Sequence, residues 1–87
     1  MIKIVYTKIF LKSARRLPPK IQEKLSKLLS FLEENPFNRL LHTKHLTGEL
    51  AGFFSFRITR DWRVVFQFLE PGVIKLIDVS HRKDIYK

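Results

Sequence analysis

The sequence predicts an α+β domain in which two helices pack on one mainly antiparallel sheet. Three observations predict this class. A short alternating strand opens the chain, a helical periodicity interrupted by a proline pair follows, and three strand-like runs separated by turns complete it. The predicted order is β-α-α-β-β-β: an N-terminal strand, a helical hairpin and a three-stranded antiparallel meander. Because 87 residues support one modest core, residues 1–87 are expected to form a single domain without a linker.

The first half of the chain supplies the strand and both helices. Residues 2–6 alternate apolar and polar side chains, as a strand does. Thr7 is a suitable N-cap for a helix whose apolar positions follow at helical spacing: Phe10, Ala14 and Leu17. Pro18 and Pro19 end that helix and begin the next. The second helix has the clearest period, at Ile21, Leu25, Leu28, Leu29 and Leu32. Asn35, before a proline, ends it.

The second half of the chain is organised around a hairpin. Residues 53–58 read as an aromatic-rich strand, residues 59–61 as a turn, and the return strand begins at Trp62. One predicted face is apolar and carries Phe54, Phe56, Ile58, Val64, Phe66 and Phe68. The other carries Ser55, Arg57, Arg63, Val65 and Gln67. Arginines on a half-apolar face are costly when buried and useful when they meet an anion, so this face is the predicted working surface.

The chain ends with one more strand and a polar tail. Residues 70–72 form a turn, and residues 73–79 are almost entirely apolar, which indicates a strand inside the sheet. Gly48 and Gly52 mark turns in the segment before the hairpin. Residues 80–87 are short and polar.

Composition restricts the partners and the compartment. The chain has 17 Lys and Arg against 8 Asp and Glu, a net charge of +9 and a pI of about 10.3, so it attracts polyanions such as nucleic acid or an acidic protein. It has no cysteine, which excludes disulfides and thiolate metal sites. No apolar run reaches the length of a membrane span and no secretory signal opens the chain. We therefore expect a cytoplasmic protein without a membrane partner.

The candidate site combines cations with proton carriers. Arg57, Arg63 and Arg82 suit a phosphate because guanidinium binds it in a planar, bidentate way. The alternative is that they form surface ion pairs with Asp61, Asp78 and Asp84. His81, where a strand ends, suits proton transfer near neutral pH, and a histidine hydrogen-bonded to backbone is equally consistent with the pattern. A zinc triad of His42, His45 and His81 lacks suitable spacing and a further ligand, so we predict no metal and no cofactor.

The segments KHLTGELAGFFSFRITRDWRVVF and IDVSHRKDIYK, together with the strand and helical hairpin before them, resemble the RelE/ParE superfamily of toxins from bacterial type II toxin–antitoxin systems. The resemblance covers essentially the whole chain. It implies a small basic toxin that cleaves mRNA without a metal, usually in the A site of the 30S ribosomal subunit. It also implies an antitoxin that neutralises the toxin, with operator DNA bound only through the pair.

The resemblance assigns roles to individual residues. On the RelE pattern, Arg57 lies near a catalytic lysine, Arg63 matches the strand arginine, and Arg82 and Tyr86 match the arginine and tyrosine of the tail. Ser55 stands near a second RelE lysine, so that pair of lysines is not preserved.

On the YafQ-like pattern, His45, Asp61 and His81 match the proton carriers, whereas Arg57 replaces a further histidine. The acid and the base therefore stay open among His81, Tyr86, Asp61 and His45. The predicted RNA-binding cations beside Arg63 and Arg82 are Arg57, Arg60, Lys44 and Lys83. Two other functions remain: inhibition of DNA gyrase, as in ParE-type members, and nucleic-acid binding without catalysis. The tail residues favour the nuclease.

Overall fold

The computed structural model describes residues 1–85 and confirms the predicted α+β architecture. Its strands and helices are β1 (Lys3–Tyr6), α1 (Lys8–Arg15), α2 (Pro19–Glu34), β2 (Lys44–His45), β3 (Phe54–Arg57), β4 (Trp62–Glu70), β5 (Val73–His81) and α3 (Arg82–Ile85). Two short 3-10 turns, Arg39–Leu41 and Gly48–Leu50, flank β2. None of the helices in the described range is long and apolar enough to cross a membrane.

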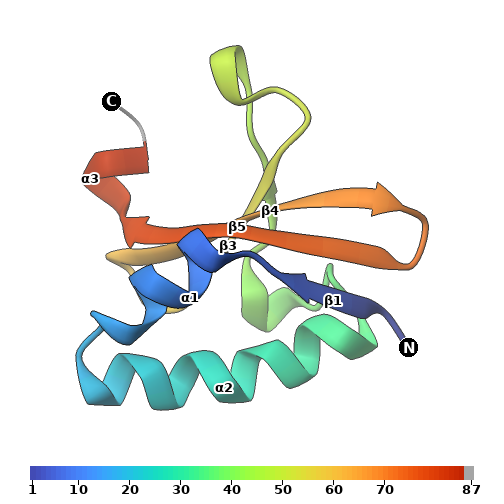
Figure 1. Ribbon diagram of the computed structural model, residues 1–87. Coiled ribbons are helices and arrows are strands. Elements are labelled where there is room, and N and C mark those ends of the chain that lie inside the picture. The colour runs from blue at the N-terminus through green and yellow to red at the C-terminus, as the bar shows by residue number, and fades with distance from the viewer. Residues whose placement is uncertain (86–87) are drawn as a thin grey trace.

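The strands form one five-stranded sheet in the order β1-β5-β4-β3-β2. The edge strand β1 runs parallel to β5, and every other pairing is antiparallel, which confirms the predicted meander of β3, β4 and β5. Figure 1 shows α1 and α2 on one side of the sheet, and α3 and the loop between β2 and β3 on the other. We call these sides the inner face and the outer face.

The helix boundaries follow the predicted capping residues. The hydroxyl of Thr7 accepts a hydrogen bond from the backbone N–H of Phe10 (3.1 Å), and it donates to the carbonyl of Leu76 on β5 (2.9 Å). One side chain therefore both begins α1 and ties it to the sheet. Pro18 precedes α2, with Pro19 as its first residue, and Asn35 ends the helix. The start of α1 and both ends of α2 lie where the sequence predicts them, whereas α1 ends at Arg15, so Leu17 lies outside the helix that was predicted to include it.

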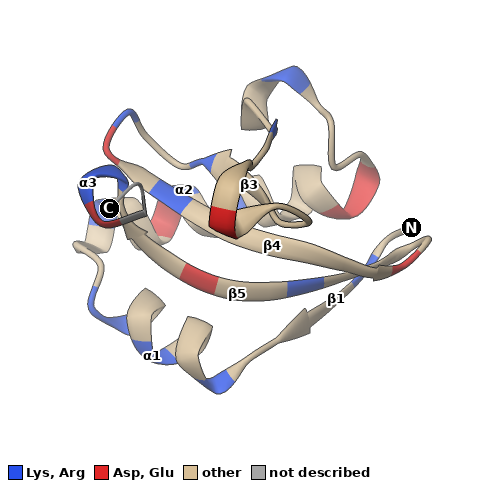
Figure 2. Ribbon diagram, turned by 90° about the horizontal axis from the view of Figure 1, so that it is seen from above, with Lys and Arg blue, Asp and Glu red and all other residues tan. Residues whose placement is uncertain are grey.

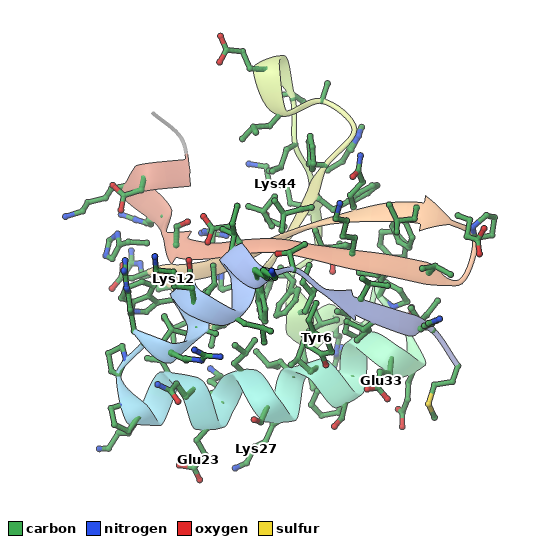
Figure 3. The ribbon with its side chains drawn as sticks, viewed as in Figure 1. Tyr6, Lys12, Glu23, Lys27, Glu33 and Lys44 are labelled. Carbon is green, nitrogen blue, oxygen red and sulfur yellow. The ribbon has the colours of Figure 1, made fainter. Side chains whose placement is uncertain are left out.

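The core lies between the inner face and the two long helices. The predicted apolar positions of the hairpin supply its centre, since Phe56, Val64 and Phe66 have no exposed surface. The helices contribute Phe10, Leu25, Leu28 and Leu32. Polar helix residues such as Glu23 and Lys27 extend from the far side of α2 into solvent (Figure 3). Burying one face of each element in this way is the main stabilisation available to so small a domain.

The sequence did not predict four short elements. Strand β2 has two residues and α3 has four, so neither is long enough to show a hydrophobic period. The 3-10 turns are equally short. Strand β5 also continues two residues beyond the predicted Val79, to His81. Strand β2, helix α3 and the end of β5 lie at or beside the candidate site, whereas the Arg39–Leu41 turn packs against α2 and places Leu41 in the core.

Candidate functional site

The strand register arranges the outer face in two rows that run across the sheet. The first row contains Arg57, Arg63 and Ser80, which lie directly opposite one another on β3, β4 and β5. The second row contains Lys44, Ser55, Val65 and Asp78, on β2 to β5. The first row runs from two arginines on β3 and β4 to the Ser80 hydroxyl on β5. The second row runs from Lys44 on β2 to the Asp78 carboxylate on β5. Figure 2, seen from above this face, shows basic segments in β4 and α3 beside an acidic segment in β5.

A cavity of about 500 Å³ opens at the cationic end of these rows. Its lining residues are His42, Lys44, Arg57, Arg63, Arg82 and Lys83, and we call it the basic cavity. It draws together five of the predicted phosphate-binding or catalytic residues from β2, β3, β4 and α3. Figure 3 shows the side chain of Lys44 reaching over the sheet on the side away from α1 and α2. No carboxylate belongs to this lining within residues 1–85.

The two arginines of the hairpin have unmet hydrogen-bonding capacity. The Nε atoms of Arg57 and Arg63 are buried, and neither has a hydrogen-bond partner within the described part of the chain. The Oγ of Ser55, in a residue with no exposed surface, is also unpartnered. Arg57 and Arg63 are directly opposed, and like charges in that position destabilise a sheet. Unpaired buried donors and repelling charges both favour an anion between them.

Arg82 is held differently. Its Nε lies 3.9 Å from Oδ1 of Asp61, and its backbone N–H donates to the carbonyl of Asp61 at 2.7 Å. These contacts fasten the start of α3 to the turn between β3 and β4. Both side chains are about half exposed, so the ion pair contributes roughly 0–1 kcal/mol. Among the ion pairs that the sequence offers as an alternative for the three arginines, the pair of Arg82 and Asp61 forms. Arg60 is exposed in the same turn and does not line the basic cavity.

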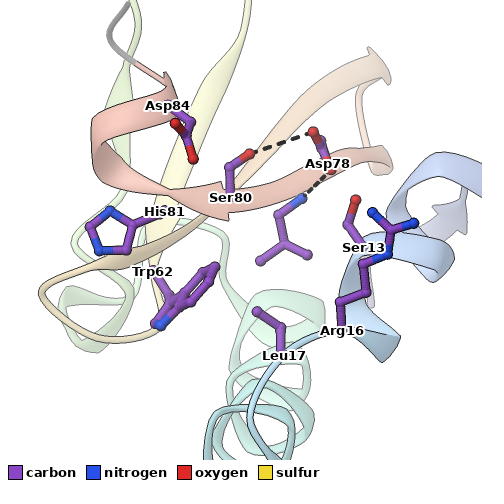
Figure 4. A pocket seen from close by; sticks show the side chains of 9 residues that line it. Ser13, Arg16, Leu17, Trp62, Asp78, Ser80, His81 and Asp84 are labelled. Carbon is purple, nitrogen blue, oxygen red and sulfur yellow. Dashed lines mark hydrogen bonds between the residues drawn. The ribbon is translucent and has the colours of Figure 1, made fainter.

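His81 lies in a separate cavity of about 370 Å³ (Figure 4). Its ring contacts Trp62 edge to face at a centroid distance of 5.4 Å, and its Nδ1 accepts a hydrogen bond from the backbone N–H of Lys83 (3.4 Å). Leu17, from the segment between α1 and α2, lines the same cavity. Successive strand residues point to opposite faces, so Ser80 joins the arginine row while His81 does not.

The remaining predicted proton carriers are dispersed. His45 pairs with Phe54 in the register, on the other side of the sheet from Lys44, with ring centroids 4.8 Å apart. Asp61 is occupied with Arg82. Tyr86 lies outside the described residues. No group of three or more His, Cys, Asp or Glu side chains in residues 1–85 is arranged to hold a metal ion.

His42 is the residue of the basic cavity that the sequence suggested only as a zinc ligand. It ends the Arg39–Leu41 turn with φ of 49°, a left-handed conformation that is uncommon outside glycine. Such conformations concentrate at functional sites. A histidine after two leucines and a turn gives no periodic signal, so the structure was needed to place this imidazole beside the arginines.

Comparisons with known proteins agree with this architecture. Residues 4–86 match the family model described as the ParE toxin of the type II toxin–antitoxin system parDE. No curated protein matches the chain. A YoeB/ParE toxin from Agrobacterium tumefaciens is 25% identical over 93% of this chain and 99% of its own, with a TM-score of 0.78. The RelBE2 toxin–antitoxin complex from Mycobacterium tuberculosis is also 25% identical, over 93% and 98%, with a TM-score of 0.77.

A further structure shares the fold at lower identity. YafQ from Escherichia coli strain BL21(DE3) is 16% identical over the full length of both chains, with a TM-score of 0.80. The family model covers nearly all of the chain, and the solved toxins reproduce its arrangement of strands and helices. The chain therefore belongs to the ParE toxin family of type II toxin–antitoxin systems, within the RelE/ParE superfamily.

Proposed function

We propose that this toxin is a metal-independent endoribonuclease that cleaves mRNA in the A site of the 30S ribosomal subunit and so inhibits translation and growth. The observation that carries the proposal is the basic cavity, in which two buried guanidinium Nε donors lack partners. A phosphodiester supplies the charge and the acceptor oxygens that these donors need. Because ribosomes translate mRNA in the cytoplasm, the proposed substrate places the toxin there as well.

The chemistry requires little besides charge and proton transfer. The ribose 2′-oxygen attacks the scissile phosphorus, the bond from phosphorus to the 5′-oxygen breaks, and a 2′,3′-cyclic phosphate and a 5′-hydroxyl remain. Arg57, Arg63 and Arg82 offset the charge that develops on the phosphate oxygens. A general base takes the proton of the 2′-hydroxyl, and a general acid protonates the leaving 5′-oxygen.

The proton carriers are proposed from position as well as from resemblance. His81, Asp61, His45 and Tyr86 remain candidates. His42 joins them because its imidazole lines the basic cavity together with the arginines. A carrier must come within hydrogen-bond reach of the RNA, and the bound state can tighten contacts that the free toxin lacks. Lys44 and Lys83 act as further phosphate-binding groups.

Single-turnover cleavage on programmed ribosomes tests the proposal. Arg63→Met removes the charge and retains most of the apolar stem, whereas Arg60→Met removes an equal charge from outside the basic cavity. Loss of one preorganised donor commonly lowers such rates by about 10²–10³-fold. We expect that loss for Arg63→Met and a rate within about threefold of the wild type for Arg60→Met, since exposed charges contribute little. Equal rates in all three proteins would reject the phosphate-binding role.

A second candidate function rests on the family match itself, since the matching model describes ParE toxins. Members of that type inhibit DNA gyrase on the same fold. In that case the toxin would leave transcripts intact and would trap gyrase on broken DNA. A binding protein without catalysis would do neither. A single culture that expresses the toxin distinguishes the three functions, because cleaved transcripts, gyrase trapped on DNA, or neither of these would be found in it.

The partner is proposed to be an antitoxin encoded beside the toxin, acidic enough to match a net charge of +9. The Mycobacterium tuberculosis structure is a toxin–antitoxin complex, which supports this assignment. Opposite charge accelerates the encounter, and apolar contact provides salt-resistant affinity. Operator DNA is then bound through the complex, not by the toxin alone.

A further inference from the structure

A second cavity, of about 240 Å³, opens on the outer face beside the basic cavity. Its lining residues are Leu50, Val65, Ile77, Asp78, Ser80 and Asp84, and we call it the acidic cavity. Arg63 of the basic cavity and Ser80 of the acidic cavity lie directly opposite each other on β4 and β5. Neighbouring strands are about 4.8 Å apart, so the two cavities are separated by one strand spacing.

An irregularity in β5 shapes the acidic cavity. Val65 pairs with Asp78 and Phe66 pairs with Leu76, so Ile77 is an extra residue between the two pairs. A bulge of this kind turns side chains away from strict alternation. Ile77 and Asp78 therefore both contribute to the lining of one cavity. The arrangement combines an apolar wall with a carboxylate, one strand away from two arginines.

The Asp78 carboxylate is fixed in place. Its Oδ1 accepts a hydrogen bond from the backbone N–H of Val79 (2.8 Å), and its Oδ2 lies 3.5 Å from the Ser80 hydroxyl, which donates to it. Each carboxylate oxygen has a further lone pair. Ser55, opposite Val65 in the second row, has a buried hydroxyl without a partner between the cationic and acidic ends. A ligand that spans the two cavities would meet the arginines at one end and the Asp78 carboxylate at the other, while Ser55 lies buried beneath it.

The chemistry of the acidic cavity excludes a second phosphate, because carboxylates repel it. The cavity suits a group with apolar faces and hydrogen-bond donors at its edge. A nucleobase has both properties, and within one nucleotide it lies next to a phosphate. Leu50, Val65 and Ile77 provide the apolar lining for its faces. A carboxylate accepts hydrogen bonds and donates none, so it selects bases by their donors.

We propose that the acidic cavity binds the nucleobase adjacent to the cleaved phosphate, and that Asp78 makes it selective for guanine. Guanine presents N1–H and the N2 amino group side by side, and one carboxylate accepts both. Adenine and cytosine present a single amino group beside an acceptor nitrogen, which the carboxylate repels. Uracil presents one N–H between two carbonyl oxygens. The inference rests on the proposed RNA substrate and adds the base that the site prefers.

The test measures binding of short 2′-deoxy oligonucleotides that carry one variable base among abasic positions and cannot be cleaved by 2′-OH attack. Fluorescence anisotropy gives the ratio of affinities for guanine and thymine, the DNA analogue of uracil, in each protein. A bidentate pair discriminates between bases by about 5–150-fold. We expect a guanine preference on the order of tenfold in the wild type. Asp78→Asn should reduce it to about twofold or less, because an amide presents a donor where guanine needs an acceptor.

Controls separate this inference from the proposed function. Glu70→Gln removes an equal charge at the turn between β4 and β5 and should retain the preference. Asp84→Asn, on α3, provides a second variant if Asp78→Asn unfolds, and it should weaken the preference. An unchanged preference in folded Asp78→Asn, or no preference in the wild type, overturns the inference alone, and if Asp78→Asn unfolds, an unchanged preference in Asp84→Asn does so. Fully abasic strands that bind Arg63→Met as well as they bind the wild type would instead reject the phosphate-binding role.

Discussion

The opposed arginines predict that the free toxin becomes more stable when its site is damaged. Arg57 and Arg63 face each other across β3 and β4, and each has a buried Nε without a partner. Two charges about 7 Å apart repel by roughly 2 kcal/mol at an effective dielectric constant near 20. Partial exposure and salt reduce that figure. We therefore expect Arg63→Met, which retains the apolar stem, to raise the free energy of unfolding by about 1 kcal/mol.

Thermal and urea unfolding measure this change. For a domain of this size, about 1 kcal/mol corresponds to a melting temperature higher by roughly 4–8 °C. An uncleavable oligonucleotide should stabilise the wild type further, by about 2.7 kcal/mol at a hundred times its dissociation constant, and should stabilise Arg63→Met much less. Arg60→Met, from an exposed turn position, should alter neither quantity. If Arg63→Met is destabilised and retains its response to the oligonucleotide, Arg63 is a structural residue and the reasoning is refuted.

Further predictions concern single groups. His42→Gln should slow single-turnover cleavage more than His81→Gln, because His42 lines the basic cavity and His81 does not; equal slowing would show that the two cavities join in the bound state. Thr7→Ala should lower the free energy of unfolding by about 1 kcal/mol through loss of the cap of α1, as urea titration would show. Asp61→Asn should change stability by less than about 1 kcal/mol, and a larger loss would mean that its contact with Arg82 is stronger than an exposed pair. Affinity for RNA should fall steeply with salt, and Arg57→Met should make that slope shallower by about 0.7 for a single strand.

The hairpin was predictable because alternation fixes which side chains share a face. The sequence placed Arg57, Arg63 and Ser55 together, opposite the apolar set, and the strand register confirms it. Turns and caps followed from residues with strong local preferences, such as Thr7 and Pro19. The arginine half of the site could therefore be foreseen from local patterns alone.

The other half depends on details that local patterns do not contain. A strand that ends at Val79 leaves the position of His81 open, whereas two more residues pair His81 with Trp62, one register step away from the pair of Arg63 and Ser80. The bulge at Ile77 arises from the pairing of β4 with β5, and the sequence of neither strand alone indicates it. His42 joins the arginines through a turn that has no hydrophobic period. These features determine which of the candidate proton carriers line the basic cavity.

The most direct test of the central claim is to induce the toxin in growing cells and map the RNA ends that appear. The account predicts growth arrest and new 5′-hydroxyl ends inside translated messages, lost in Arg63→Met and retained in Arg60→Met. The same cultures can be examined for gyrase bound to broken DNA. Intact messages together with trapped gyrase would contradict the account and assign the basic cavity to a different target.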